Sequence, residues 1–198
     1  MREVWVKIHL PDIICRLFVR ILLFYRRIRY GFPFRKIPLT RGKFAIVDDD
    51  DFEKLAGYKW FAVKNGRSFY AHRMKNSKKA RPRQILVQMH RVILNAPDGV
   101  LVDHINHNGL DNRKANLRLA TIEQNSWNRR KNPGNFTSKY KGVSWHKLSR
   151  KWHARIVYKQ KWISIGYFDD EQSAARAYDE KAKELFGDFA YLNFPDEK

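Results

Sequence analysis

The chain is almost devoid of cysteine and has no long uninterrupted apolar segment. Its one cysteine, Cys15, excludes an intramolecular disulfide and leaves no cysteine cluster for a structural zinc, which fits a reducing cytoplasm. The apolar run at residues 13–25 is broken by Arg16 and Arg20 and falls short of the roughly 20 apolar residues that cross a bilayer. It also lacks a clear signal-peptide cleavage site, so we expect a cytoplasmic protein without firm membrane association.

Acidic residues are scarce as well. The 198 residues hold 20 Asp and Glu against 40 Lys and Arg, which gives a formal net charge of +20 and a pI near 10.2. No acid occurs between Glu123 and Asp169, where lysine and arginine are frequent. Such a charge attracts a polyanion, and we expect nucleic acid, whose counterions are released on binding. A merely soluble basic protein is the alternative, but the uneven charge favours a binding face.

Residues 1–35 differ from the rest because apolar side chains recur at near-helical spacing with arginines between them. This basic amphipathic pattern is typical of a helix that lies on a membrane surface or contacts DNA, and it is equally compatible with a loosely packed extension. Beyond it we expect short elements and a basic loop suited to phosphate contact. They are a strand at 43–47, a helix at 52–57 capped by the acids 48–51, strands at 68–73 and 85–88, and the loop at 75–83.

Residues 102–125 gather a carboxylate, an imidazole and several amides in one short segment. The pattern predicts a strand at 100–104, a loop at 106–112, a return strand at 117–119 and a helix that begins at Thr121, where Gln124 completes a capping box. This succession brings together Asp103, His104 and Asn125. A carboxylate, an imidazole and amides are suited to holding a hard metal ion against a phosphate and activating water.

The segment from about His90 to Arg130 resembles the HNH endonuclease family, whose active site is called ββα-metal, and in particular phage and intron-encoded homing endonucleases. Asn125 stands where many relatives carry the final histidine. The resemblance implies that Asp103 and Asn125 bind the divalent metal, that His104 is the general base, and that Asn116 holds the loop that orients His104.

Elementary chemistry is compatible with these roles. Mg²⁺, or Mn²⁺, prefers oxygen ligands such as a carboxylate and an amide, and an imidazole with an ordinary pKa near ~6.5 is mostly neutral at pH 7. Arg113 and Arg118 are suited to clamping the phosphate and equally to structural salt bridges. His107 is interpreted as a loop residue or a DNA contact, whereas His90 either supports the site or packs in the core.

A turn-forming linker at residues 131–137 precedes a module with different periodicity. Alternation predicts strands at 151–158 and 161–168, and residues 170–186 switch to a helix ended by Gly187. Residues 138–195 closely resemble the APETALA-two/ethylene-response-factor (ERF) DNA-binding domain. The resemblance implies a three-stranded antiparallel sheet packed on one helix, with the sheet in the major groove. Ser144 and Ser164 replace an arginine and a tryptophan of that family, so the resemblance implies affinity rather than a plant-type target sequence.

The DNA contacts expected in this module combine its basic residues with the outward side of its strands. Trp152 is expected to pack in the core, and the position of Trp145 is open. The candidates are Lys141, Trp145, Lys147, Lys151, His153, Arg155, Trp162 and Ser164.

Together these features predict an α+β chain with an extension at 1–35, an HNH core at 36–130, a linker at 131–137 and a DNA-binding domain at 138–195. We expect a monomeric, metal-dependent endonuclease that acts on double-stranded DNA, without an obligate protein partner, of the homing type found in phages and mobile elements. The alternative is a non-catalytic DNA-binding regulator with a decayed nuclease domain.

Overall fold

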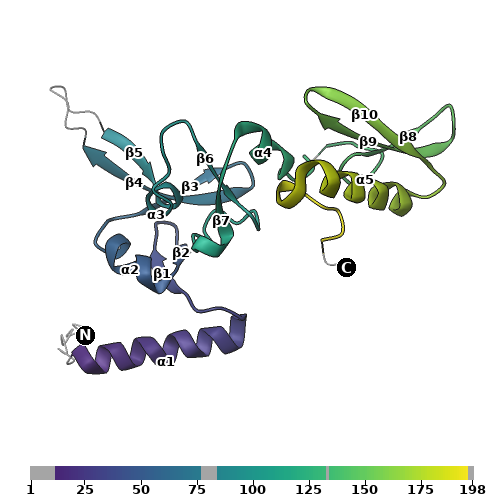
Figure 1. Cartoon of the computed structure of the whole chain (residues 1–198). Coiled ribbons are helices and arrows are strands. Elements are labelled where there is room, and N and C mark those ends of the chain that lie inside the picture. The colour runs from purple at the N-terminus through teal and green to yellow at the C-terminus, as the bar shows by residue number, and fades with distance from the viewer. Residues whose placement is uncertain (1–11, 77–83, 133, 196–198) are drawn as a thin grey trace, which may run out of the picture. The chain divides into compact units, whose positions relative to one another are not determined.

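The computed structural model describes residues 12–76, 84–132 and 134–195 (Figure 1). The chain forms two compact units, the first from residues 1–98 and 106–118 and the second from residues 99–105 and 119–198. Helices and small antiparallel sheets occur in both, which confirms the expected mixture of α and β structure. Most of the basic loop expected at 75–83, and the first 11 residues of the chain, lie outside the described residues.

The first unit begins with the expected amphipathic helix, α1 (Asp12–Tyr30). The helix has no buried residue, and large apolar side chains such as Ile13 and Phe24 are 77% and 67% exposed. Its end is held by Arg26, which donates to the backbone oxygen of Phe34 and lies over the Phe34 ring. Among the helices of the described residues, none is both long and apolar enough to cross a membrane.

Two small antiparallel sheets form the body of this unit. One pairs β1 (Arg35–Pro38) with β2 (Phe44–Val47), and the other has the order β3 (Phe61–Asn65), β4 (Ser68–Asn76), β5 (Gln84–Gln88). Sequence periodicity predicted β2, β4 and β5. It missed β1 and β3, because strands of four or five residues carry too little alternation to stand out. A short helix, α3 (Met89–Ile93), follows β5.

The acids at residues 48–51 were expected to cap a short helix, but the side chain of Asp48 does not form the cap. Helix α2 (Asp49–Ala56) has Asp48 at its N-cap position, but the Asp48 side chain makes no capping hydrogen bond. Its Oδ2 atom instead accepts from the backbone nitrogen of Lys114 at 2.7 Å, and the Asp51 carboxylate pairs with the Lys114 ammonium at 2.9 Å. The carboxylates therefore anchor a segment far away in sequence, although Asp49, Asp50 and Asp51 still occupy the helix's first turn.

The second unit holds β6 (Leu101–His104) and α4 (Ile122–Trp127), together with the end of β7 (Leu117–Ala120), which pairs with β6. The strands and helix occur where the sequence predicted them. Thr121 caps α4 through the expected capping box with Gln124.

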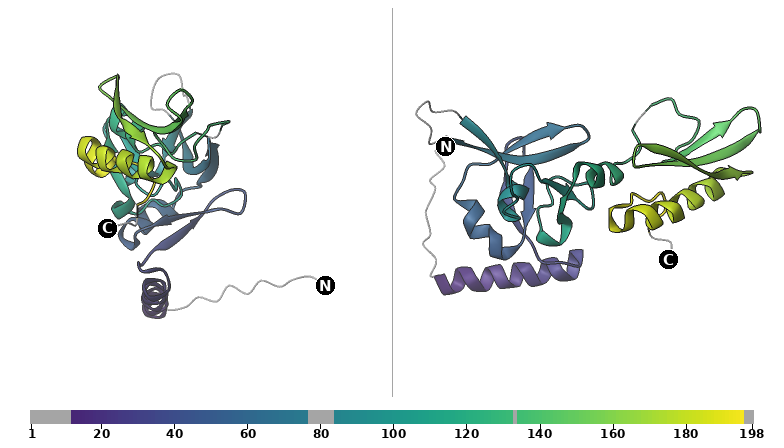
Figure 2. Two further views of the ribbon diagram at one scale, coloured as in Figure 1. Left: turned by 90° about the vertical axis from the view of Figure 1, so that its right-hand side faces the viewer. Right: turned by 45° about the horizontal axis from the view of Figure 1, so that its top comes forward.

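The same unit contains a three-stranded antiparallel sheet with the order β10 (Lys161–Phe168), β9 (Lys151–Tyr158), β8 (Val143–His146). Helix α5 (Glu171–Phe186) runs along one face of this sheet, as two views show (Figures 1 and 2). Buried Ala154 and Ile156 of β9 pack against its alanines and Tyr178, so the predicted alternation is confirmed. Gly187, with φ 53°, ends α5 and begins a short 3-10 helix, η2 (Gly187–Phe189).

Candidate functional site

Asp103 and His104 lie at the end of β6, where both side chains are buried with 6% and 5% exposure. The side-chain amide of Asn128 donates to both carboxylate oxygens of Asp103, at 3.0 and 2.9 Å. The same nitrogen is 3.4 Å from the backbone oxygen of His104. Asn128 therefore orients the Asp103 carboxylate and fixes the end of the strand that carries His104.

Asn128 is a site residue that the sequence interpretation missed. It caps the C-terminal end of α4, three residues after Asn125, so both side chains lie on one face of that helix. Asn125 is half-buried and Asn128 is buried. The Asn-x-x-Asn spacing was the available signal, because residues three positions apart lie on the same side of a helix.

In the first unit, Asn116 closes the loop that follows His104 in the chain. Asn116 ends a short 3-10 helix, η1 (Lys114–Asn116), and its side-chain oxygen accepts from the backbone nitrogen of Asn106 at 2.9 Å. Its amide nitrogen donates to the backbone oxygen of Asp111 at 2.8 Å. Asn106 in turn donates to the Asp111 carboxylate at 2.9 Å. One buried amide thus joins both ends of the loop at 106–111.

Arg113 forms a structural salt bridge, one of the two roles that the sequence left open. Its guanidinium donates to both carboxylate oxygens of Asp111, at 2.8 and 2.6 Å, and lies over the Phe32 ring. Burial raises the pKa of Asp111, but the hydrogen bonds and charge of Arg113 outweigh it and leave that pKa below its usual value. Arg118 lies half-buried on β7.

The two other histidines singled out from the sequence lie in the first unit. His90 is buried in α3, with its ring against Tyr70 and its Nε2 atom 3.2 Å from Oε1 of Gln88. That environment is core packing. His107 is half-buried in the loop at a positive φ of 61°.

The sheet face away from α5 carries most of the DNA contacts expected from the sequence. Strand register places Ser144 and Tyr167 opposite His153, and Ser164 opposite Arg155, so these side chains share one face. Trp162 of β10 is 65% exposed, and the Arg155 guanidinium lies 4.4 Å from its ring centroid. Lys151 begins β9 on the same side, opposite His146. The face combines cations with an exposed aromatic ring.

His153 lies in a small aromatic cluster at the centre of this face. Its ring stacks on Tyr167 with centroids 4.5 Å apart, His146 packs edge-on against the same tyrosine, and Nε2 of His153 is 2.9 Å from the Ser164 hydroxyl. Burial, then the charges of Arg155 and His146, lower the pKa of His153. The alternation of β10 could have revealed Tyr167, which the sequence interpretation did not select.

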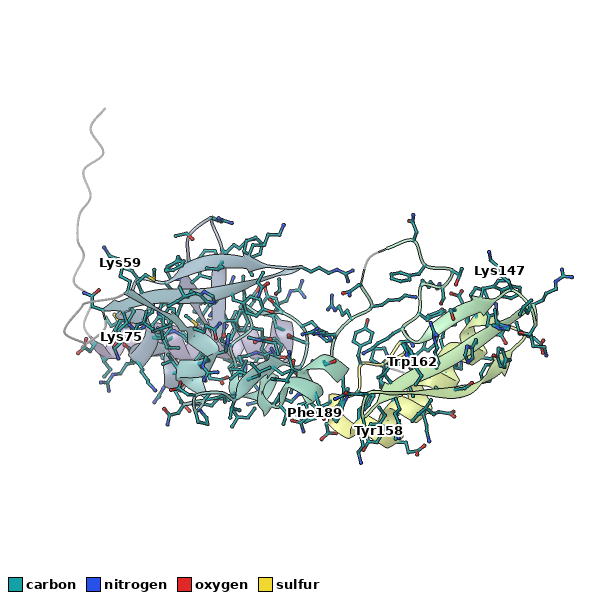
Figure 3. All side chains as sticks on the ribbon, turned by 90° about the horizontal axis from the view of Figure 1, so that it is seen from above. Lys59, Lys75, Lys147, Tyr158, Trp162 and Phe189 are labelled. Carbon is teal, nitrogen blue, oxygen red and sulfur yellow. The ribbon has the colours of Figure 1, made fainter. Side chains whose placement is uncertain are left out.

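Three other candidates in this module have different surroundings. Trp145 pairs with Trp152, so it lies on the α5 side of the sheet, and the two rings make an edge contact at 5.1 Å. The Lys141 ammonium donates to the backbone oxygens of Trp127 and Arg129, at 2.6 and 2.8 Å, instead of facing outward. Lys147 is exposed in the turn after β8, at the end of the sheet remote from Phe189 (Figure 3).

The donor set at Asp103 fits a hard divalent cation. Asn128 donates to the carboxylate, but an ionised carboxylate has about four acceptor positions, so capacity for a cation remains. Asn125 would add an amide oxygen from the same helix, and the hydrogen bond from Asn128 is of the kind that typically orients a carboxylate that binds a metal ion. Among the residues that the structure describes, no group of three or more His, Cys, Asp and Glu side chains is placed so that it could hold a metal ion.

Comparisons with known proteins agree with the resemblance of this segment to HNH endonucleases. Residues 88–127 match the family model of the HNH endonucleases. A protein of Acanthamoeba polyphaga mimivirus, named as an HNH endonuclease, is 35% identical over 162 residues, 77% of this chain and 76% of its own length. Protein 3.8 of Escherichia phage T7 is 37% identical over 94 residues, 48% of this chain and 76% of its own length. The chain belongs to the HNH endonuclease family.

A second similarity is to plant proteins. APETALA2-like protein 2 of Oryza sativa subsp. indica is 45% identical over 60 residues, which are 29% of this chain and 14% of the plant protein. The likeness covers one module of a much longer protein. It agrees with the sheet-and-helix module of the second unit.

Proposed function

We propose that the protein is a site-directed DNA endonuclease that hydrolyses phosphodiester bonds with a divalent metal ion. The observation that carries the proposal is the position of Asp103 and His104 at the end of β6, with the Asp103 carboxylate held by Asn128 of the α4 cap. Membership of the HNH family supports a nuclease. The ββα-metal arrangement would be formed by β6, β7 and α4.

In the proposed reaction, His104 takes a proton from water as the oxygen attacks the phosphorus atom in line with the departing O3′. The bond from phosphorus to O3′ breaks and the leaving O3′ takes a proton from solvent water, so the products are a 5′ phosphate and a 3′ hydroxyl. Asp103 and Asn125 would hold Mg²⁺ or Mn²⁺, which stabilises negative charge on the phosphate and the leaving oxygen when it is bound. Asn116 would keep the loop after His104 in shape, and Arg118 would contact the phosphate.

We further propose that residues 138–195 form a targeting domain beyond a nuclease core at 36–130 and a connection at 131–137. The DNA-reading face would consist of the outward side chains of the sheet and a basic turn. Its members are Lys147, Lys151, His153, Arg155, Trp162 and Ser164. Viral origins of two relatives support a phage or mobile-element setting and the homing type.

A plasmid assay distinguishes this nuclease from a non-catalytic DNA-binding regulator. Supercoiled plasmid is incubated with MgCl₂ and the purified protein, beside His104→Ala and His107→Ala. We expect nicked or linear plasmid from the wild type and from His107→Ala, and none from His104→Ala or in the presence of EDTA. His107 is a matched control because it is a histidine three residues further on that takes no part in the proposed proton transfer; loss of a DNA contact there would weaken plasmid binding and leave the cutting step itself in place. Equal cutting by the wild type and His104→Ala would contradict the proposal.

A further inference from the structure

The C-terminal end of helix α4 packs against the module formed by β8, β9, β10 and α5 in the second unit. Trp127, the last residue of α4, stacks on Phe186 of α5 with ring centroids 4.6 Å apart and an interplanar angle of 11°. Tyr158 of β9 flanks the same indole at 6.3 Å. Phe186 belongs to the core cluster that contains Ile156 and Tyr178, so the indole extends the core of that module.

Lys141 makes a second connection between the same two parts. Its ammonium donates to the backbone oxygens of Trp127 and Arg129, at and just beyond the C-terminal end of α4. Carbonyls at a helix end lack partners within the helix, and a cation there complements the helix dipole. The half-buried Lys141 side chain thus satisfies groups that otherwise require water.

The backbone of Lys141 is itself fixed within the module. Its nitrogen donates to the side-chain oxygen of Asn193 at 2.7 Å, and the Asn193 amide donates back to the Lys141 oxygen at 3.2 Å. Asn193 is held in turn by the buried carboxylate of Asp179 on α5. A continuous set of hydrogen bonds therefore runs from α5 to the end of α4.

The connecting segment is also braced. The Lys131 ammonium donates to the backbone oxygens of Ser138 and Tyr140, at 2.6 and 2.8 Å, and lies 4.7 Å from the Phe136 ring centroid. Lys131, the first residue of the predicted linker, is thereby bound to residues just past its end. This geometry differs from that of an open, flexible tether.

We propose that Trp127 and Lys141 are positioning residues that fix Asn125 and Asn128 of α4 relative to the DNA-reading sheet, so that the enzyme cuts at a set distance from the sequence it binds. The inference rests on the proposed function. A flexible chain of seven residues has a root-mean-square span of about 15 Å. At about 3.4 Å per base pair, a tether alone would spread the cuts over roughly four base pairs.

The test begins with selection of a preferred duplex from a library of random sequences by the full-length wild type. That duplex is then cut in MgCl₂, and the 5′ ends of the products are mapped at nucleotide resolution. If the wild type selects no sequence, or cuts nothing, the proposed function itself fails. A wild type that binds and cuts one site at scattered positions would overturn only the positioning inference.

The variants are Trp127→Ala and Lys141→Met, which keeps the aliphatic stem and removes the ammonium. We expect both to keep binding the selected duplex, because neither side chain belongs to the DNA-reading face, and to spread their cuts over roughly four base pairs, the reach of the connecting segment alone. Lys183→Met, which removes an exposed lysine of α5, is the matched control and should keep the wild-type cutting positions. Unchanged positions in both variants, or loss of site binding in both, would overturn the inference.

A second arm does not depend on either substitution. Two glycines inserted after Asn135 lengthen the connecting segment without touching Trp127 or Lys141. If docking sets the distance, the insertion alone leaves the cutting positions unchanged, whereas the insertion combined with Lys141→Met spreads them further than Lys141→Met alone. A shift or spread caused by the insertion alone would show that the connection acts as a tether and would contradict the inference.

Discussion

The side-chain nitrogen of Asn128 lies 2.9 and 3.0 Å from the two carboxylate oxygens of Asp103, although the residues are 25 positions apart in the chain. This contact joins the end of β6 to the cap of α4. It gives the Asn128 amide a defined partner, and it fixes the Asp103 carboxylate before any cation binds. We therefore expect loss of Asn128 to lower metal affinity in a different way from loss of Asn125, which is a proposed ligand.

We predict that Asn128→Ala lowers the rate of plasmid cutting at low Mg²⁺ by about 10- to 100-fold, the usual effect of losing a hydrogen bond that orients a metal ligand. Excess Mg²⁺ should restore much of the rate, because Asp103 and Asn125 remain. Asn125→Ala should not be restored in this way, since it removes a proposed ligand. Cutting rates measured over a range of MgCl₂ concentrations distinguish an orienting residue from a metal ligand. Identical metal dependence in the wild type and Asn128→Ala would disprove the orienting role.

A glycine in the second unit gives a test of packing. Gly142 has φ 78°, and a Cβ atom there would lie 2.0 Å from the Tyr178 ring and 2.9 Å from the backbone oxygen of Arg155. We expect Gly142→Ala to lower the free energy of unfolding by about 2–4 kcal/mol through overpacking and backbone strain. Urea unfolding followed by tryptophan fluorescence measures this change.

The matched control is Gly187→Ala at the end of α5. Gly187 also has a positive φ, 53°, but a Cβ atom there meets no atom within 4 Å. Its substitution should cost about 1–3 kcal/mol, from the backbone conformation alone, because φ 53° with ψ −131° suits glycine. Equal losses at Gly142 and Gly187 would show that the close approach of Tyr178 contributes nothing.

Sequence periodicity predicted the elements whose pattern is long or whose ends are marked. Alternation along β9, the capping box of Thr121 and the terminal Gly187 are local signals, and the structure has each where it was expected. The short strands β1 and β3 have no such signal. They form because neighbouring strands offer hydrogen-bond partners, which a single segment does not reveal.

The partners of individual polar side chains were harder to predict. Asp48 looked like a helix cap, yet it accepts from Lys114, 66 residues away, and Lys141 looked like a phosphate contact, yet it meets the end of α4. Residue type gives a side chain's hydrogen-bonding capacity, whereas the fold decides which of several partners comes within reach.

Lys141 predicts a specific dependence of stability on pH. Burial lowers its pKa from 10.5 to about 8 in the folded chain. Between these two pH values the unfolded chain binds more protons than the folded one, so the free energy of unfolding should rise with pH over this window, by up to about 3 kcal/mol. Below pH 8 both states are protonated and the slope from Lys141 vanishes.

Lys141→Met removes this titration and leaves the other groups in place. Urea unfolding of the wild type and the variant at several pH values from 7 to 10 measures the difference between them. We expect the wild type to gain stability relative to Lys141→Met as the pH rises above 8. A constant difference across the range would mean that the ammonium keeps an ordinary pKa despite its burial.

The sheet face predicts how DNA binding depends on salt. Arg155 projects from the face opposite α5 and lies over the Trp162 ring, so its guanidinium can reach a phosphate while the indole offers a flat apolar surface. Arg155→Ala should weaken binding to a mixed-sequence duplex about tenfold and reduce the slope of log affinity against log salt by about one, as expected for one lost phosphate contact. Fluorescence anisotropy at several NaCl concentrations measures both quantities.

The control for Arg155 is Lys183→Ala, which removes an equal charge from the helix on the other side of the sheet. If the sheet face binds DNA, this variant should keep the wild-type slope, because its charge acts on the duplex only from a distance and is screened beyond about 10 Å at 0.1 M salt. Equal changes in slope for the two variants would mean that net charge alone drives binding. A change confined to Arg155→Ala would instead place a phosphate at the sheet, because only a contact made on one face distinguishes two variants of the same net charge.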